Sequence, residues 1–324
     1  MFRVPRFSHA LILLVMVALP AATLAQAYPT RPIRLILPFA AGGPTDLLGR
    51  AISQKLGEQL GQTVMADNRT GAGGNLGAEL TAKSPPDGYT LVLTSPFVAI
   101  SPALYAKLNY DAAKDLAPIS LVALIQNVLV VHPSVPAKTL KEFIQLARAY
   151  PGKLNFGSGG VGATSHLAPE LLKSLARLDM VHVPYKGTGQ AVVGLISGQI
   201  DMLIMAAPAI APHIQDRKVR ALAVLSEKRT TPLPDVPTAK EAGLDNFEVG
   251  LWFGMFAAAG TPRDIINRLN LGLHKALAAP DLKERLATIG VEPMTSTPEE
   301  FADFLRSETA RYARLIKDAG IKTN

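Results

Sequence analysis

Three glycine-rich segments of the sequence stand between an apolar run and a helical pattern, a placement that favours anion binding. They are residues 38–46 (PFAAGGPTD), 71–74 (GAGG) and 157–166 (GSGGVGATSH). The first N–H groups of a helix have no intrahelical partner, and the helix dipole adds about half a positive charge at that end. Because glycine lets a ligand approach the backbone closely, such loops can bind an anion without Lys or Arg.

Two of these segments carry side chains that could take part in binding or catalysis. Residues 44–46 (PTD) suit the start of a helix, where Thr45 offers a hydroxyl. Asp46 acts either at the ligand or as a first-turn acid that the helix dipole favours. His166 could serve as a catalytic base, but we favour a first-turn histidine that holds its loop by hydrogen bonds.

The glycines at 157, 159 and 162 match G-x-G-x-x-G, so dinucleotide binding is an alternative for the third segment. That fingerprint also needs an acid after the following strand to hold a ribose. The following apolar run, residues 181–185, is instead succeeded by Lys186, and Asp179 precedes it. This mismatch argues against a nucleotide and favours a carboxylate.

The remaining reactive residue types form no recognisable metal-binding or catalytic motif. The histidines at 132, 182, 213 and 274 lack the H-x-x-x-H spacing of a metal site, and no G-x-S-x-G nucleophile motif occurs. Lys186 could neutralise an anion or be a solvated loop lysine, and Asp201 could bind a ligand donor or cap a turn. The weaker alternative to a binding protein is an enzyme based on His166, with Thr164, Ser165 or Asp201 as partners. We expect no metal and no cofactor.

The composition is that of a globular protein with room for two lobes. The chain has 324 residues, of which 48% are hydrophobic and 18% charged, and it contains no cysteine. Single cores stop growing near about 250–300 residues. Without cysteine there is no disulfide, thiolate metal site, catalytic thiol or acylated N-terminal cysteine. The formal net charge of +7 comes without a dense basic run, so we expect no nucleic-acid partner.

The first 27 residues have the pattern of a secretory signal peptide. Arg3 and Arg6 precede an apolar run at 10–19 (ALILLVMVAL), and small residues lead to an A-x-A site at 25–27. The run is shorter than the about 20 residues that a membrane span needs. We expect cleavage after Ala27 or Ala25 and export to the periplasm.

Apolar runs and amphipathic stretches alternate along the rest of the chain, which predicts parallel sheets covered by helices. One helix is marked by apolar residues at four-residue spacing from Leu48 to Leu60, and the last helix opens with a capping box at 297–300. Predicted strands include residues 33–39, 63–68, 89–94, 154–157, 181–185, 200–205 and 221–225.

Two long apolar runs, residues 119–131 and 247–257, are interpreted as strands that cross between two lobes. On this interpretation lobe one comprises residues 28–125 and 250–324, and lobe two comprises residues 126–249. A cleft between two such lobes can bind a small ligand by hinge closure.

Several short motifs occur in order along the chain. They are YPTRPI (28–33), PFAAGGPTD (38–46), NRTGAGG (68–74), PDGYT (86–90), KD (114–115), PIS (118–120), SHLA (165–168), HVPYKG (182–187) and PDVPT (234–238). Together they resemble the Bug-type solute receptors of tripartite tricarboxylate transporters, over nearly the whole chain after the signal peptide.

The resemblance implies an α/β periplasmic binding protein fold of the second type, with two crossover strands and the ligand cleft between the lobes. It implies a non-enzymatic, monomeric receptor that closes on a small organic carboxylate and delivers it to the permease subunits of the membrane transporter. A sensory module that presents its ligand to a sensor kinase ectodomain is the alternative.

In such receptors the ligand carboxylates lie between two loops, where backbone amides and ordered waters hold them more than charged side chains do. Carried over to this sequence, the loops are residues 39–46 and 158–166. Other residues at the ends of strands would complete the site. The expected ligand-binding residues are Phe39, Ala40, Gly42, Gly43, Thr45, Asp46, Thr94 and Ser95 from lobe one, and Ser158, Gly159, Val161, Gly162, Ala163, Thr164, His166, Tyr185, Lys186 and Asp201 from lobe two.

Overall fold

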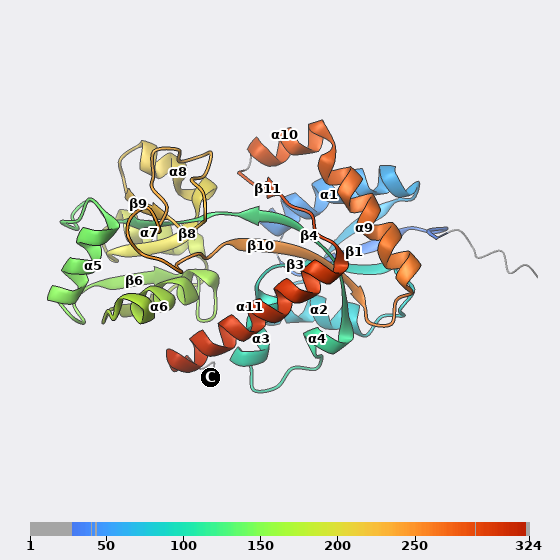
Figure 1. Ribbon diagram of the computed structural model, residues 1–324, viewed down its shortest axis with the longest axis horizontal. Helices are drawn as coiled ribbons and strands as arrows, with labels where there is room; N and C mark the ends of the chain where they lie inside the picture. The colour runs from blue at the N-terminus through green and yellow to red at the C-terminus, as the bar shows by residue number, and fades with distance from the viewer. Residues whose placement is uncertain (1–27, 40, 43, 289, 322–324) are drawn as a thin grey trace, which may run out of the picture.

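The chain forms two α/β lobes that lie end to end, each built on its own β-sheet (Figure 1). The computed structural model describes residues 28–39, 41–42, 44–288 and 290–321, so the predicted signal peptide lies outside it. Within these ranges, no helix is long and apolar enough to cross a membrane.

The sheet of lobe one has six strands in the order β11-β4-β10-β3-β1-β2. Strand β1 pairs in parallel with β2 and β3, and β10 is antiparallel to β3 and β4. The bounds are β1 (Ile33–Leu37), β2 (Val64–Asn68), β3 (Thr90–Thr94), β4 (Leu116–Ile125), β10 (Leu251–Ala258) and β11 (Glu292–Pro293).

The sheet of lobe two has five strands in the order β7-β6-β8-β5-β9. Strands β6, β7 and β8 run in parallel, and β5 is antiparallel to β8 and β9. The bounds are β5 (Asn127–Val131), β6 (Asn155–Ser158), β7 (Val181–Pro184), β8 (Met202–Ala206) and β9 (Arg220–Val224).

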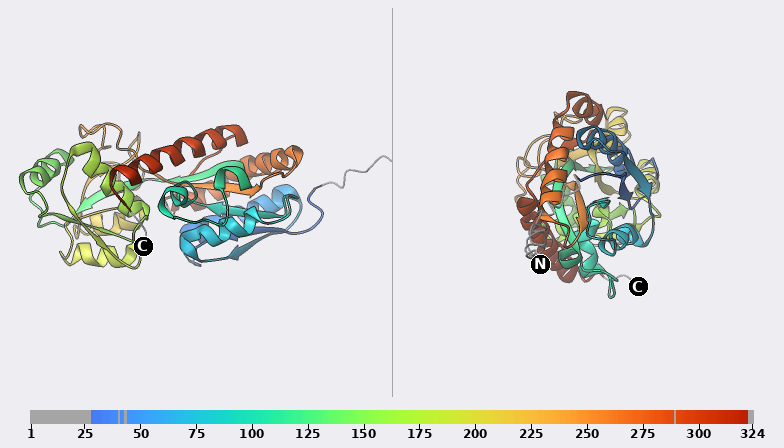
Figure 2. Two further views of the ribbon diagram at one scale, coloured as in Figure 1. Left: turned by 90° about the horizontal axis from the view of Figure 1, so that it is seen from below. Right: turned by 90° about the vertical axis from the view of Figure 1, so that its right-hand side faces the viewer.

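Helices cover both faces of each sheet (Figures 1 and 2). Those of lobe one are α1 (Pro44–Leu60), the 3-10 helix η1 (Ala72–Gly74), α2 (Asn75–Ala82), α3 (Phe97–Leu104), α4 (Ala112–Asp115), α9 (Arg263–Ala278), α10 (Pro280–Thr288) and α11 (Pro298–Asp318). Those of lobe two are α5 (Leu140–Ala149), α6 (Thr164–Ala176), α7 (Thr188–Ile196) and α8 (Ala207–Gln215).

Burial on both faces explains why the central strands are continuous apolar runs in the sequence. In β1, Leu35 and Leu37 pack with α1 and α9, whereas Ile36 points to the opposite face and packs with α3 and α11. In β5, Leu129 and Val130 divide in the same way between the two faces of the second sheet. The alternation of strands and helices predicted from the sequence is confirmed.

Each of the two long apolar runs is divided between the lobes rather than forming one continuous strand, which corrects the prediction. The run at 119–131 breaks at Gln126, between β4 and β5. In the run at 247–257, Phe247 belongs to the core of lobe two, and β10 begins at Leu251 in lobe one. The runs look continuous in the sequence because both halves enter a core. Leu251 pairs with Ile125, so the two crossings lie side by side.

The sequence pattern predicts no helix at α3, α4 or α8, and the structure forms all three. Helix α3 contains Pro102, and α8 contains Pro212 and a proline in its first turn. Proline interrupts the helical hydrogen-bond ladder, so apolar segments that contain it do not give a recognisable helical signal. Helices α3 and α8 both contribute to the cavity described below.

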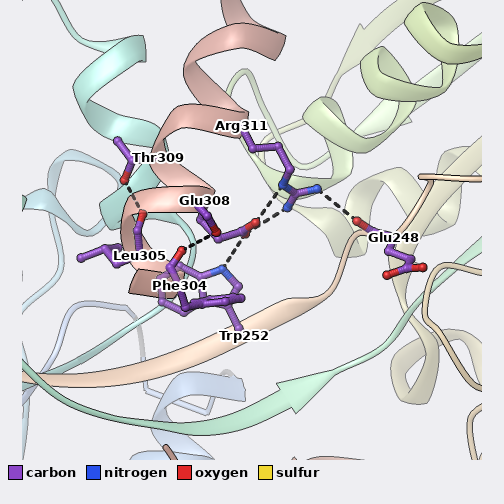
Figure 3. A network of polar contacts seen from close by, with 8 residues as sticks. Glu248, Trp252, Phe304, Leu305, Glu308, Thr309 and Arg311 are labelled. Carbon is purple, nitrogen blue, oxygen red and sulfur yellow. Dashed lines mark hydrogen bonds and ion pairs between the residues drawn. The ribbon is translucent and has the colours of Figure 1, made fainter. Parts of the chain in front are cut away.

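Helix α11 runs along the molecule and packs on α3 of lobe one and α6 of lobe two (Figure 2). It opens with the predicted capping box, in which Thr297 and Glu300 each bond the other's backbone N–H. Figure 3 shows that its buried Glu308 accepts a hydrogen bond from Trp252 Nε1 and pairs with Arg311. Arg311 also donates to the backbone oxygen of Glu248, so α11 is tied to the second crossing.

Candidate functional site

A cavity of about 580 Å³ lies between the lobes, where both lobes and the crossings contribute to its walls. Its size is within the usual range for small-molecule sites. The lining residues are Phe39, Thr45, Gly73, Ser95, Phe97, Tyr105, Asn127, Gly159, Gly160, Val161, Ala163, Thr164, Ser165, Thr188, Met205, Ala206, Ala209, Leu251 and Phe253.

The loop between β6 and α6 is held in shape by three side chains of its own segment. Ser165 Oγ accepts the Gly159 N–H at 3.0 Å, Ser158 Oγ accepts the Gly160 N–H at 3.1 Å, and His166 Nδ1 accepts the Gly162 N–H at 3.1 Å. These glycine N–H groups are therefore already hydrogen-bonded. The expectation that the glycine amides themselves bind the ligand does not fit this geometry.

Three other N–H groups of the same loop remain for a ligand. Those of Val161, Thr164 and Ser165 have no hydrogen-bond partner in the described part of the chain, and all three residues line the cavity. Thr164 is the first residue of α6, so the helix dipole favours negative charge at this point. The arrangement is suited to a carboxylate.

His166 has the structural role that we favoured from the sequence. Its ring stacks on that of His182, which stacks in turn on Phe156. Burial is the largest cause that lowers the pKa of His166, to about 3, and that of His182, to about 4. Both rings are therefore neutral near pH 7, and the neutral His166 accepts the Gly162 N–H.

Ser158 and His182 are close enough for a nucleophile–base pair, with Oγ and Nε2 2.6 Å apart. Ser158 is fully buried, however, and its hydroxyl also donates to the Gly160 carbonyl oxygen. Neither residue lines the cavity. The pair therefore supports the ligand loop and forms no part of the cavity wall among the described residues.

In lobe one, Asp46 organises the loop between β1 and α1. Its carboxylate accepts hydrogen bonds from the Gly42 N–H, Arg50 Nε and Asn68 Nδ2. The bond from Gly42 is the largest cause that lowers the pKa of Asp46. Asp46 does not line the cavity. The predicted site residues Ala40 and Gly43 lie outside the described residues.

Two buried hydroxyls of lobe one face the cavity. Thr45, in the first turn of α1, is 5% exposed, and Ser95, after β3, is 7% exposed. Neither hydroxyl has a hydrogen-bond partner in the ranges that the structure describes, and both residues line the cavity. The neighbouring Thr94 is buried beneath the site and does not line it.

An aromatic wall on the same side was missed by sequence reasoning, apart from Phe39. It is formed by Phe39, Phe97 and Tyr105, with the rings of Phe97 and Tyr105 6.2 Å apart. Gly73 lies against it with φ +64, and a Cβ at this position would lie 2.5 Å from Phe97. The glycine segment 71–74 was recognised from the sequence. Phe97 and Tyr105 were not, because they are distant from this segment in sequence and lie in or directly after α3, a helix that the sequence did not predict.

The remaining expected residues of lobe two are not brought to the cavity. The Tyr185 ring lies against Gly157 and Gly194 within the lobe, and Lys186 is exposed. Asp201 accepts the Asn155 N–H at 2.8 Å. Asn155 begins β6 and Asp201 precedes β8, and the other ends of these two parallel strands lead to the ligand loop and to α8, so Asp201 lies at the opposite edge of the sheet. The sequence allowed Asp201 either to bind a ligand or to cap a turn, and its hydrogen bond to Asn155 fits the capping role.

The rest of the lining includes Gly160 and Ser165, which the sequence placed in the predicted loop 158–166 without naming them as binding residues. The other lining residues had no sequence signal for binding. They are Asn127, Met205, Ala206, Leu251 and Phe253 at the crossings and adjoining strands, and Thr188 and Ala209 in the first turns of α7 and α8. The others come together only because the two sheets meet at this point. Among the described residues there is also no cluster of three His, Asp or Glu side chains that could hold a metal.

A cavity enclosed by two α/β lobes that are joined at two adjacent crossings defines a periplasmic binding protein of the two-lobed type. Residues 48–321 match the family model described as the tripartite tricarboxylate transporter family receptor. The chain belongs to this family, whose relatives include Bug proteins.

Similar proteins support this assignment over the whole fold. Protein BugT of Bordetella pertussis is 38% identical over 302 residues, which are 92% of each chain. The R. palustris protein Rpa4515, solved with adipate, is 35% identical with a TM-score of 0.79, covering 91% of this chain and 100% of its own. MatC from Rhodopseudomonas palustris, solved with bound malate, is 34% identical with a TM-score of 0.74, covering 89% and 100%.

Proposed function

We propose that this protein is a periplasmic receptor that captures a small organic carboxylate between its lobes and delivers it to the permease of a tripartite tricarboxylate transporter. The observation that carries the proposal is one set of groups around the cavity. The N–H groups of Val161, Thr164 and Ser165 in lobe two, unpaired among the described residues, line the same cavity as the buried Thr45 and Ser95 of lobe one.

The amide groups would hold the carboxylate, and the hydroxyls would link it to lobe one. A hydrogen bond to a charged group contributes about 1.5–3 kcal/mol, and the dipole of α6 adds to it. Because the ligand then touches both lobes, it binds the closed arrangement more tightly than an open one and shifts the equilibrium toward closure. Waters can complete the contacts at little loss of affinity.

The ligands of two relatives support the carboxylate class, since adipate and malate are both organic acids. The signal-peptide pattern at 1–27 supports export to the periplasm. We propose that the mature protein acts there as a monomer and reaches the permease in its ligand-bound form. Expression with the native N-terminus and sequencing of the mature protein tests the first step, with Tyr28 or Gln26 as the expected first residue.

Carboxylate binding is tested by thermal denaturation of protein that has been unfolded and refolded to remove carried ligand. A ligand at 100 times its Kd should stabilise the fold by about 2.7 kcal/mol. The panel should contain aliphatic and aromatic mono-, di- and tricarboxylates. If none of these acids raises the melting temperature, the proposed function is wrong.

The role of the amide groups is tested by Thr164→Pro against Thr164→Ala. Proline is well tolerated at the first helical position, and Ala163 before it already has the extended conformation that a residue before proline prefers. Both variants lose the hydroxyl, but only Thr164→Pro loses the N–H. We expect Thr164→Pro to bind the carboxylate about tenfold more weakly than Thr164→Ala, measured by calorimetry.

Delivery is tested by uptake of the radiolabelled acid identified in this way. Deletion of the gene should abolish high-affinity uptake in the native host. The wild-type gene should restore it, and the Thr164→Pro gene should restore it only at higher ligand concentration. Undiminished uptake after deletion would separate the protein from transport and favour a sensory role.

A further inference from the structure

We propose that a second cavity between the lobes, on the other side of the two crossings from the ligand cavity, controls how far the lobes can open. This rear cavity has a volume of about 680 Å³. It lies between Gln126 and Gly250 at the crossings, Glu292 and Phe304 of lobe one, and Glu227 and Glu248 of lobe two. The inference goes beyond the proposed function, because it concerns the closure of the lobes whatever ligand they capture.

Side chains alternate between the two cavities along both crossings. In the second crossing, Leu251 lines the ligand cavity, whereas Gly250 and Trp252 on either side of it line the rear cavity. In the first crossing, Asn127 lines the ligand cavity and Gln126 lines the rear cavity. Successive residues of an extended chain point to opposite sides. The crossings therefore form the partition between the two cavities.

The order of strands in the two sheets leads to the same arrangement. Each sheet continues past its crossing strand to an edge strand, from β4 to β11 in lobe one and from β5 to β9 in lobe two. The rear cavity is lined by Glu292 of β11 and by residues 225–228, which directly follow β9. The ligand cavity is instead lined by residues at the ends of β1, β3, β6 and β8, on the other side of the crossings.

Rotation of the lobes about the crossings changes the two cavities in opposite senses. Separation of the lobes at the ligand cavity brings Glu292 toward residues 225–228 and narrows the rear cavity. In the arrangement described here, the lobes touch beside the ligand cavity, where Gly162 lies against Leu104, and the rear cavity is wide. Opening must consume this space, and it ends when the rear walls come into contact.

A side chain that fills the rear cavity should therefore hold the lobes on the ligand. When only the closed arrangement binds tightly, the measured affinity is reduced in proportion to the fraction of protein that is closed. A group in the rear cavity raises this fraction without touching the ligand. The largest possible gain in affinity is set by the open fraction of the wild type.

Glu292 and Glu248 can each carry such a group, one from each lobe. Both are exposed and line the rear cavity, and neither carboxylate has a hydrogen-bond or ion-pair partner in the described part of the chain. Glu292 lies in β11, and strands accommodate Trp well. Glu248 accepts a hydrogen bond from Arg311 through its backbone oxygen, which any side chain retains (Figure 3). Glu292→Trp and Glu248→Trp therefore fill the rear cavity without removing a hydrogen bond or ion pair.

The first test is the affinity of the mature protein for the acid that the thermal panel identifies, measured by calorimetry. We expect Glu292→Trp and Glu248→Trp to bind this acid about three- to tenfold more tightly than the wild type. Met65→Trp is the matched control, because Met65 is exposed in β2 and lines neither cavity. Its affinity should be unchanged. Unchanged or weaker binding by both rear variants, or an equal gain in Met65→Trp, overturns the inference.

The second test measures the separation of the lobes without any ligand. The chain contains no cysteine, so Leu80→Cys in α2 and Val193→Cys in α7 provide one spin-label site on each lobe. Both side chains are exposed, and both helices begin beside the ligand cavity, next to Gly73 and at Thr188. Double electron–electron resonance then reports the distance between the lobes.

We expect the ligand-free wild type to populate a longer distance than the ligand-bound protein, and the two rear Trp variants to shift toward the shorter one. Identical distributions in the wild type and both variants contradict the inference. So does a wild type that shows only the short distance, because the rear cavity then has no opening to limit. If no acid binds and the distance still shifts, the proposed carboxylate function fails while this inference stands.

Discussion

The imidazole rings of His166 and His182 are stacked with their centroids 3.9 Å apart and their planes 14° from parallel. The first ring comes from α6 and accepts the Gly162 N–H, and the second comes from β7 and bonds the Ser158 hydroxyl. The shape of the ligand loop therefore depends on two neutral histidines in contact. Protonation of both would place two like charges within this stack.

This pair predicts a loss of stability in mild acid. Folding lowers the pKa of His166 to about 3 and that of His182 to about 4, below the ordinary value of 6.5. Between pH 6.5 and about 4 the unfolded chain therefore binds protons that the folded chain refuses. The free energy of unfolding should fall across this window by up to about 1.4 kcal/mol per pH unit for each histidine. Denaturant unfolding at pH 7.0, 6.0 and 5.0 measures it.

The matched control is the double variant His166→Asn and His182→Gln. The Asn amide oxygen can replace Nδ1 as the acceptor of the Gly162 N–H, the Gln amide NH₂ can replace Nε2–H as the donor to Ser158 Oγ, and neither side chain titrates. The pH slope of the double variant should be shallower than that of the wild type by the contribution of the two histidines. Equal slopes would show that the histidine pair is not the source of the pH dependence.

The loop-holding role of His166 could be predicted from the sequence, but which amides of the loop remain unpaired could not. A histidine in the first turn of a helix after a glycine loop suggests a loop-holding hydrogen bond, and the structure contains it. The same reasoning named Val161 and Thr164 as binding residues, but beside them it named Gly159 and Gly162, whose N–H groups are already paired. Which amides remain unpaired depends on the rotamers of Ser158 and Ser165, because their hydroxyls accept the Gly160 and Gly159 N–H groups. Composition does not encode that choice.

For the fold as a whole, features that depend on local sequence could likewise be predicted, whereas features that depend on the packing of distant segments could not. Apolar periodicity predicted both sheets and most helices because it reports burial, which is local to each element. The break at Gln126, the start of β10 at Leu251 and the wall of Phe97 and Tyr105 depend on how the two sheets meet, which the residues next to them in sequence do not indicate. The motif resemblance indicated where the cleft lies, whereas the apolar character of its walls emerged only from the assembled structure.

A second prediction concerns the tie between α11 and the second crossing. Arg311→Met removes the partner of Glu308, whose carboxylate would remain buried with only the Trp252 N–H. We expect a destabilisation of about 2 kcal/mol, below the range for fully buried pairs because the Arg311 side chain is 36% exposed. Adding Glu308→Gln keeps an acceptor for Trp252 without the charge, so the double variant should recover most of the loss. Denaturant unfolding measures both, and a double variant no more stable than Arg311→Met would refute the pairing argument.

The last prediction concerns the contact between the ligand loop and lobe one. A Cβ at Gly162 would lie 2.2 Å from Leu104 Cδ2 at the end of α3, and Gly162 has φ +80. The clash exists only when the lobes are together, whereas the backbone strain exists in every folded arrangement. Gly162→Ala should therefore weaken ligand binding about three- to tenfold, because it favours open lobes, and lower stability by about 1–2 kcal/mol.

The two effects separate when Gly162→Ala is introduced into a Leu104→Ala background. Removal of the leucine side chain relieves the clash but not the strain, so the loss of affinity should largely disappear while the loss of stability persists. Calorimetry and denaturant unfolding of the four proteins complete the double-mutant cycle. If the affinity loss is the same in both backgrounds, the contact between Gly162 and Leu104 does not control closure, and strain within the loop must account for the whole effect.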